Sequence, residues 1–288
     1  MKTYLNGKLV EREKAVISVF DHGLLYGDGV FEGIRAYDKL IFRLEQHIDR
    51  LYRSANAIGL KIPLTKAKMI KAVIETLKAN SLADAYIRLV VTRGPGDLGL
   101  DPRKCAKATV FIITDKIALY PDEFYRNGLA IVTAETRRNH PRSLDPRIKS
   151  LNYLNNILGK IDAIKAGSAE AIMLTCDDYV AECTGDNIFA VRGDELMTPP
   201  VSVGALEGIT REAVMELAKN TDMKAGEKML KMDDIYGSDE VFLTGTAAEI
   251  IPVISIDGRR IGNGKPGAKT LKLLKEFRKL TKTDGVRY

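Results

Sequence analysis

The chain has 288 residues, 45% of them hydrophobic and 28% charged, a balance typical of a globular protein that buries a core without metals or disulfides. Lys and Arg outnumber Asp and Glu by 44 to 38, and this scattered excess does not favour binding to nucleic acid. No segment is apolar for long enough to cross a bilayer, and the N-terminal stretch lacks the apolar run of a signal peptide, so we expect a cytoplasmic protein without a membrane partner.

The first part of the chain alternates short strands with two helices. Asn6-Gly7 is a typical two-residue hairpin turn, and apolar residues spaced three and four apart predict the helices. A glycine-rich stretch at 23–29 and a loop rich in Gly, Pro and Asp at 93–103 interrupt this pattern. The predicted elements are a hairpin over 4–10, strands over 30–37 and 40–43, helices over 44–59 and 65–79, and antiparallel strands over 86–92 and 108–114.

A polar stretch around Pro121 separates these elements from a second group. We interpret 1–116 as a smaller N-terminal domain, 117–127 as a connection and 128–288 as a larger domain. The layout predicts an α+β protein with antiparallel strand groups and helices on their outsides. The later elements are strands over 129–133, 171–175, 188–192 and 240–244, helices over 152–166 and 210–219, and a helix over 269–282 with an apolar face of Leu271, Leu274 and Phe277.

Lys149 lies at the predicted start of the helix over 152–166. Backbone N–H groups, the helix dipole and partial burial would each lower its pKa there. A lowered pKa is what an amine needs to form a Schiff base at neutral pH. A lone lysine is more often solvated surface, so other residues must decide between the two interpretations.

Glu182 lies between two strand-like runs and is followed by a turn of small residues. A buried acid at this place would need a cationic or protonated partner. The pyridinium nitrogen of pyridoxal phosphate (PLP) is such a partner, since PLP enzymes pair that nitrogen with an acid. The alternative is an exposed glutamate in a turn.

Two segments could bind an anion such as a phosphate. Gly208-Ile-Thr-Arg211 begins a predicted helix, where free N–H groups and a hydroxyl favour anions, although ordinary capping explains it equally. Thr244-Gly-Thr-Ala247 ends a strand with small residues that permit close approach of the backbone, as an ordinary turn also does. Arg50, on the helix over 44–59, could add a guanidinium or lie at the surface.

Tyr86 and Arg88 are two apart on a predicted strand, so their side chains point to the same face. A phenol and a guanidinium side by side suit a carboxylate ligand, and a surface pair is the alternative. His22, His47 and His140 lack the clustered partners of a metal site, and the three cysteines lack CxxC spacing. We therefore expect no metal.

The order and spacing of these motifs resemble the fold-type IV PLP enzymes, a family of class IV aminotransferases and their relatives. Within it, Phe-Glu-Gly-Ile-Arg and Tyr-Ile-Arg look like the branched-chain amino acid aminotransferases. The resemblance implies a two-domain α+β fold, with a smaller N-terminal domain and a larger domain that contains a pseudo-barrel. The segments that carry it are Gly23–Gly29, Phe31-Glu-Gly-Ile-Arg-Ala-Tyr37, Lys149-Ser-Leu-Asn-Tyr153, Glu182-x-x-Gly-Asp-Asn187, Gly208–Arg211 and Thr244-Gly-Thr-Ala-Ala-Glu-Ile250.

The resemblance also implies a role for each matching position. Lys149 would carry PLP as a Schiff base and act as general base and acid, and Glu182 would bind the ring nitrogen. Tyr153 would lie near the ring hydroxyl, although some members have one more residue between the lysine and the tyrosine. The phosphate ligands would be Arg50, Ile209, Thr210, Gly245 and Thr246. The substrate carboxylate would bind Tyr86, Arg88, Thr246 and Ala247, and the side-chain pocket would hold Tyr26, Phe31 and Gly33.

The function implied is amino transfer between L-leucine, L-isoleucine or L-valine and 2-oxoglutarate. Two alternatives on the same fold are D-amino-acid transamination and aminodeoxychorismate lysis, and a third is a PLP-binding protein without turnover. The family forms active sites at dimer interfaces, which implies a homodimer or a larger assembly of dimers. The loop Gly94–Asp101 would then cover the partner's pocket.

Overall fold

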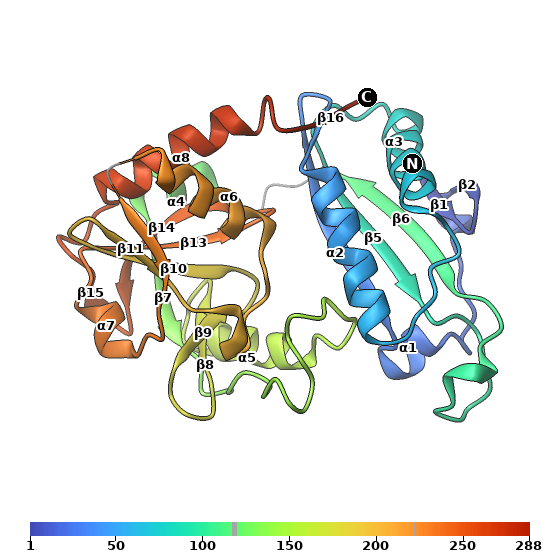
Figure 1. Cartoon of the computed structure of the whole chain (residues 1–288), viewed down its shortest axis with the longest axis horizontal. Coiled ribbons are helices and arrows are strands. Elements are labelled where there is room, and N and C mark those ends of the chain that lie inside the picture. The colour runs from blue at the N-terminus through green and yellow to red at the C-terminus, as the bar shows by residue number, and fades with distance from the viewer. Residues whose placement is uncertain (117–119, 222) are drawn as a thin grey trace. The chain divides into compact units, whose positions relative to one another are not determined.

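The computed structural model describes residues 1–116, 120–221 and 223–288, and its contacts divide the chain into two compact units (Figure 1). Unit 1 contains Met1–Ile117, Ile148–Asn152 and Thr281–Tyr288, and unit 2 contains Ala118–Arg147 and Tyr153–Leu280. Two short segments therefore return to unit 1 from beyond the expected boundary at residue 116. Of the expected connection, residues 117–119 lie outside the described part, and a helix, α4 (Asp122–Asn127), follows within unit 2.

Unit 1 is a seven-stranded sheet in the order β16-β4-β3-β5-β6-β1-β2. Helices α2 (Leu44–Ala57) and α3 (Lys66–Ala79) bury their apolar faces in the core that includes the central strands. A short helix, α1 (His22–Tyr26), occupies the stretch whose glycines predict only a loop. The strands are β1 (Lys2–Leu5), β2 (Lys8–Glu11), β3 (Gly29–Tyr37), β4 (Leu40–Phe42), β5 (Ala85–Thr92), β6 (Thr109–Asp115) and β16 (Gly285–Arg287).

The local signals in unit 1 act as expected. Asn6 and Gly7 both have positive φ, 48° and 94°, as a tight turn between two strands of a hairpin requires. Thr65 caps α3 by accepting a hydrogen bond from the N–H of Lys68. The antiparallel pairing of β5 and β6 is confirmed from Tyr86 to Thr92.

Unit 2 is built on a nine-stranded sheet with the order β12-β11-β10-β13-β14-β7-β8-β9, and β15 pairs with β14. The expected antiparallel strand groups are only part of this sheet, because β7 pairs in parallel with both β14 and β8, and β11 with β12. The strands are β7 (Leu129–Thr133), β8 (Ala171–Leu174), β9 (Val180–Cys183), β10 (Asn187–Arg192), β11 (Glu195–Thr198), β12 (Lys224–Glu227), β13 (Glu240–Gly245), β14 (Glu249–Ile256) and β15 (Arg259–Arg260).

The helices of unit 2 are α4, α5 (Leu154–Lys165), α6 (Ile209–Lys219), α7 (Met232–Tyr236) and α8 (Ala268–Leu280), together with a 3-10 turn at Val201–Val203. The predicted apolar face of α8 is partly wrong. Leu274 and Phe277 are buried, but Leu271 is 41% exposed and Leu273 takes its place in the core. No helix in the described ranges combines the length and the apolar character needed to span a membrane.

Candidate active site

Lys149 lies on an extended segment beside β3, not at the start of a helix. The N–H of Phe31 donates to the Lys149 carbonyl oxygen over 3.0 Å, and the N–H of Leu151 donates to the Gly29 carbonyl oxygen over 2.9 Å. This edge of β3 is open because β4 pairs only with its last two residues, Ala36 and Tyr37. Helix α5 begins only at Leu154, so Lys149 does not have the helix-start position expected from the sequence.

The Lys149 amine points at the ring of Phe31, with 4.6 Å between Nζ and the ring centroid. The Arg88 guanidinium also lies 4.6 Å from that centroid, and its Nη2 donates to the hydroxyl of Tyr86 over 3.2 Å. Gly33 is the cross-strand partner of Arg88, and a Cβ on Gly33 would come within 2.2 Å of the Tyr86 hydroxyl oxygen. The structure therefore brings together five residues that the sequence predicts for catalysis and substrate binding.

Arg50 is a buried residue of α2 rather than a surface arginine, and it is held by Glu32 of β3. Its Nε and Nη2 each donate to a different oxygen of the Glu32 carboxylate over 2.7 Å. His47, one helical turn earlier, contacts the same carboxylate through Nδ1 at 2.8 Å. Sequence reasoning missed Glu32 and His47, although the i, i+3 spacing of His47 and Arg50 on one helix face was a signal.

Burial and ion pairing shift the pKa values of Glu32 and His47 in this cluster. Burial alone would raise the pKa of the Glu32 carboxyl, but the Arg50 guanidinium and the His47 ring together lower it to about 2. The pKa of His47 is lowered, chiefly by burial and also by the charges of Arg50 and Lys149. Since an ionised carboxylate only accepts, the neutral His47 ring donates from Nδ1 to Glu32.

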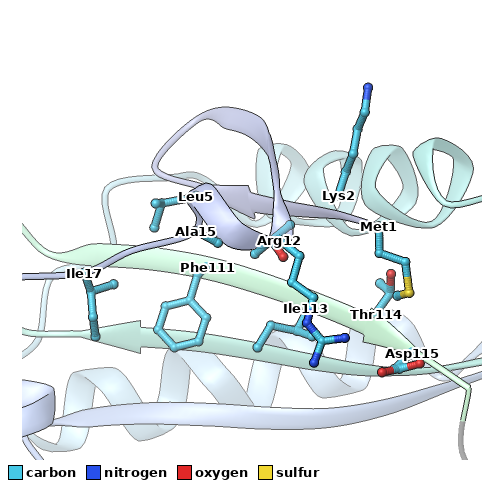
Figure 2. Close-up of a pocket in the computed structure, with 11 residues that line it drawn as sticks. Met1, Lys2, Leu5, Arg12, Ala15, Ile17, Phe111, Ile113, Thr114 and Asp115 are labelled. Carbon is cyan, nitrogen blue, oxygen red and sulfur yellow. The ribbon is translucent and has the colours of Figure 1, made fainter.

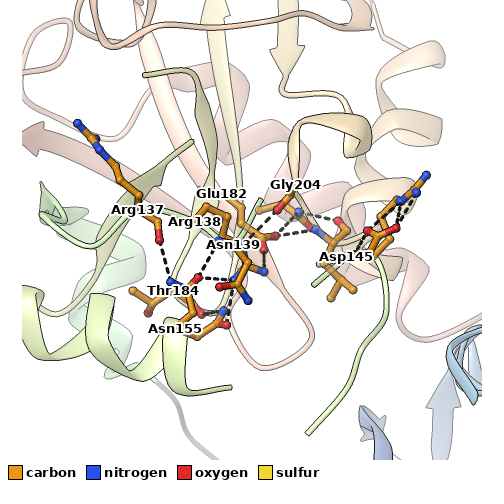
Figure 3. Close-up of polar contacts among 12 residues, drawn as sticks. Arg137, Arg138, Asn139, Asp145, Asn155, Glu182, Thr184 and Gly204 are labelled. Atoms are coloured by element: carbon orange, nitrogen blue, oxygen red, sulfur yellow. Dashed lines mark hydrogen bonds and ion pairs between the residues drawn. The ribbon is translucent and has the colours of Figure 1, made fainter. Parts of the chain in front are cut away.

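In unit 2, Glu182 is buried on β9, as a residue that binds a ring nitrogen should be. Arg138 donates to its Oε1 over 2.6 Å, and the Leu206 N–H and Asn187 Nδ2 approach Oε2 at 2.9 and 3.3 Å (Figure 3). The cationic partner that a buried acid needs is thus supplied by the chain itself. No motif in the sequence distinguishes Arg138, which Arg137 precedes and Asn139 follows.

Helix α6 begins at the first predicted anion-binding segment. Ile209, Thr210 and Arg211 are all buried, and Gly208 at the N-cap has no side chain to accept the first N–H groups. A Cβ on Gly208 would lie 2.0 Å from Oδ1 of Asn187, so glycine is required for this close approach.

The second predicted anion-binding segment lies at the end of β13, where Gly245 is half-buried and a Cβ would come 2.0 Å from Oδ1 of Asp186. Thr244 is the cross-strand partner of Asn187, so both side chains point to one face of the sheet. The Thr244 hydroxyl is buried without a hydrogen-bond partner among the described residues. Asn187 thus touches or pairs with Glu182, the start of α6 and the end of β13, and brings these three predicted elements together.

Two further predicted residues lie on α1 and at the start of α5. Tyr26 of α1 is 36% exposed, packs edge-on against His22 and donates to the carbonyl oxygen of Leu98 over 2.6 Å. Tyr153 is half-buried at the N-cap of α5. The described residues hold no group of three or more His, Cys, Asp or Glu side chains arranged to bind a metal ion.

Residues 29–256 match the family model described as amino-transferase class IV, which is most of the chain. The chain belongs to this family. A protein of Methanocaldococcus jannaschii named "Putative branched-chain-amino-acid aminotransferase" is 53% identical to it over 100% of this chain and 99% of its own length. The D-alanine aminotransferase of Bacillus licheniformis is 37% identical over 94% of this chain and 93% of its own length.

A solved structure gives the same fold. The branched-chain amino acid aminotransferase of Thermobaculum terrenum in its PLP form superposes with a TM-score of 0.86 at 31% identity, over 97% of this chain and 93% of that one. The expected two-domain α+β fold of type IV is therefore confirmed.

Proposed function

We propose that this chain is a PLP-dependent aminotransferase that moves the amino group between L-branched-chain amino acids and 2-oxoglutarate. The observation that carries the proposal is the arrangement around Phe31, where the Lys149 amine and the Arg88 guanidinium each lie 4.6 Å from the ring centroid. One group is a nucleophile and proton carrier, and the other binds a carboxylate. The names of the similar proteins support the same substrate class.

The residues present fit PLP. Helix α6 has a buried N-terminus without a side-chain cap, which suits the phosphate because free N–H groups and the helix dipole favour an anion. The unpartnered Thr244 hydroxyl and the glycine after it lie in the same neighbourhood of unit 2. We assign the phosphate to Arg50, Ile209, Thr210, Gly245 and Thr246, the ring nitrogen to Glu182, and the ring hydroxyl to Tyr153.

When bound, PLP supplies an electron sink that acidifies the Cα–H bond of an amino acid. Lys149 would act as general base and general acid, taking up the Cα proton on Nζ and giving it up again from the same atom. Tyr86 and Arg88, with the backbone of Thr246 and Ala247, bind the substrate carboxylate. Phe31 and Gly33 line the side-chain pocket with Tyr26, and Arg88 also accommodates the second carboxylate of 2-oxoglutarate.

A substrate panel tests this proposal. L-Leucine, L-isoleucine and L-valine with 2-oxoglutarate should react faster than D-alanine or aromatic amino acids, and double-reciprocal plots should be parallel. Faster turnover of D-alanine, which the similar D-alanine aminotransferase makes a specific alternative, would replace the L-branched-chain assignment. Release of pyruvate from aminodeoxychorismate would favour a lyase, and PLP binding without transfer from any amino acid would favour a binding protein.

Changing Gly33 to alanine is expected to impair substrate binding. The new methyl group would meet the Tyr86 hydroxyl, so Tyr86 must move and its contact with Arg88 is lost. We expect KM for L-leucine to rise by about tenfold, as befits the loss of one hydrogen bond to a charged group, while PLP affinity stays unchanged. Steady-state kinetics and a PLP titration measure the two quantities, and an unchanged KM would remove Gly33 from the pocket.

The control for this variant is Gly226→Ala, because Gly226 has open space around it. Gly59→Ala is unsuitable as a control, because Gly59 has a positive φ.

We also propose that the protein is a homodimer or a larger assembly of dimers. Helix α5 exposes a stripe of apolar residues at helical spacing, Leu154, Ile157, Leu158, Ile161 and Ile164, which are between 39% and 67% exposed. In unit 1, Ile17, Phe111 and Ile113 line a pocket of about 260 Å³ on the sheet (Figure 2). Such apolar surface suits a second copy of the chain.

Placing glutamates at Ile157 and Ile161 together is expected to break the assembly, because two charges on this stripe cannot be desolvated at an apolar contact. Sedimentation should show a lower mass for this double variant than for the unaltered chain. Replacing two exposed lysines of α3, Lys68 and Lys71, with alanine makes the same change in net charge away from α5 and should leave the mass unchanged. A double variant of unaltered mass would show that the stripe is not the contact.

Within such a dimer we propose that the loop Gly94–Asp101 covers the partner's pocket. Leu98 and Leu100 are 70% and 79% exposed, and the Tyr26 hydroxyl donates to the carbonyl oxygen of Leu98, so Tyr26 of α1 contacts this loop. A fully active monomer in sedimentation would contradict this role. The cytoplasmic location stays a prediction that cell fractionation tests.

A further inference from the structure

Arg138 is a buried cation of unit 2 to which the proposed reaction gives no role. Its side chain is 6% exposed. Burying a guanidinium is costly unless its donors find acceptors. The acceptors around Arg138 therefore indicate its role.

Four acceptors surround the Arg138 guanidinium (Figure 3). Nη2 donates to Oε1 of Glu182 over 2.6 Å, and Nε donates to the Gly204 carbonyl oxygen over 3.2 Å. Nη1 donates to the side-chain oxygens of Asn156 and Asn155 over 2.9 and 3.2 Å. The first turn of α5 and the loop before α6 therefore fix the guanidinium, and the guanidinium in turn holds one oxygen of Glu182.

Glu182 needs such a partner for its orientation. Strand β9 fixes its backbone, but the last torsion of a glutamate side chain has no sharp rotamer preference. An ionised carboxylate accepts about four hydrogen bonds. Three donors reach Glu182 from the described residues, namely Arg138, the Leu206 N–H and Asn187, which leaves one acceptor position for a further donor.

A purely stabilising role does not account for this arrangement. Buried ion pairs add little to stability compared with apolar side chains that pack equally well. A guanidinium fixed by three other acceptors instead sets the direction in which the Glu182 carboxylate can accept.

We propose that Arg138 is a positioning residue that aims the free acceptor site of Glu182 at the ring nitrogen of the cofactor. This inference rests on the proposed function, because it needs a cofactor with a protonated ring nitrogen in this place. Arg138 would act through Glu182 and not through a contact of its own with substrate or cofactor.

The test compares PLP with 1-deazapyridoxal 5′-phosphate, in which a C–H group replaces the ring nitrogen. Both are titrated into the chain freed of cofactor. The dissociation constant of the deaza compound divided by that of PLP measures how much the nitrogen contributes to binding. We expect Arg138→Met to reduce the preference for PLP by about tenfold, the change that follows from one misaligned charge-assisted hydrogen bond. Glu182→Gln sets the lower limit of the ratio. Arg137→Met is the matched control, since Arg137 is 43% exposed and pairs with Asp178, and its ratio should not change.

A ratio that stays unchanged or rises in Arg138→Met overturns the proposal, even if both affinities fall, because a merely structural residue would weaken both compounds equally. If that variant does not fold, Arg138→Lys decides, since lysine keeps the charge without the planar fork and should give an intermediate ratio. Failure of the unaltered chain to bind PLP would overturn the proposed function, and it is seen before any variant is made.

Discussion

Changing Lys149 to alanine is expected to abolish amino transfer. The Lys149 amine is the only group that we assign both to hold PLP and to carry the Cα proton, and its loss should lower the rate by about 10⁴-fold or more. The visible absorbance that PLP acquires when linked to a protein amine should disappear in the same variant. Rates with L-leucine and 2-oxoglutarate, and an absorbance spectrum of the protein with PLP, measure the two effects.

The variant should fold normally, because the contacts that the backbone of Lys149 makes with Phe31 and Ser54 do not need its side chain. Lys71→Ala is the matched control, since Lys71 is 76% exposed on α3 and should keep full activity and absorbance. If Lys149→Ala kept a tenth of the normal rate, another amine would have to carry the proton and the assignment would be wrong.

The elements of unit 1 are predictable because their signals are local. A turn of Asn6-Gly7, a cap at Thr65 and helical spacing in α2 each depend on residues close in sequence. The parallel pairings of β7 are not predictable in this way, because they join residues 129–133 to strands far along the chain. Strand β14 contains Pro252, which argues against a strand when the sequence is considered alone.

The candidate site likewise has residues that the sequence identifies and residues that only the fold identifies. Residue types and spacing identify Lys149, Glu182 and the start of α6, but they do not identify the buried charged residues that support the site. Glu32 and Arg138 become visible only when the fold places each beside its partner, Glu32 on β3 against α2 and Arg138 beside β9. The expected helix-start position of Lys149 is wrong for a related reason, since an open edge of a distant strand pairs with its backbone.

Changing Glu32 to glutamine is expected to destabilise the protein by about 3 kcal/mol at neutral pH, because it removes a charged partner of the buried Arg50. The pKa gives a similar magnitude, since lowering it from 4.5 to about 2 corresponds to roughly 3 kcal/mol of favourable interaction with the ionised form. Because the pKa in the folded state is depressed, this stability is present above the unfolded-state value and is lost as pH falls through the folded-state value.

The difference in unfolding free energy between the unaltered chain and Glu32→Gln should therefore be full at pH 7 and shrink steadily between about pH 4.5 and pH 2. Urea denaturation followed by circular dichroism at a series of pH values measures it. Glu75→Gln is the control, since Glu75 is half-exposed and pairs with Lys71 at 3.7 Å, and it should change stability by less than about 0.5 kcal/mol at any pH. If Glu32→Gln lowered the unfolding free energy equally at pH 7 and pH 2, the side chain of Glu32 would act through its shape. The proposal that its charge stabilises Arg50 would then be wrong.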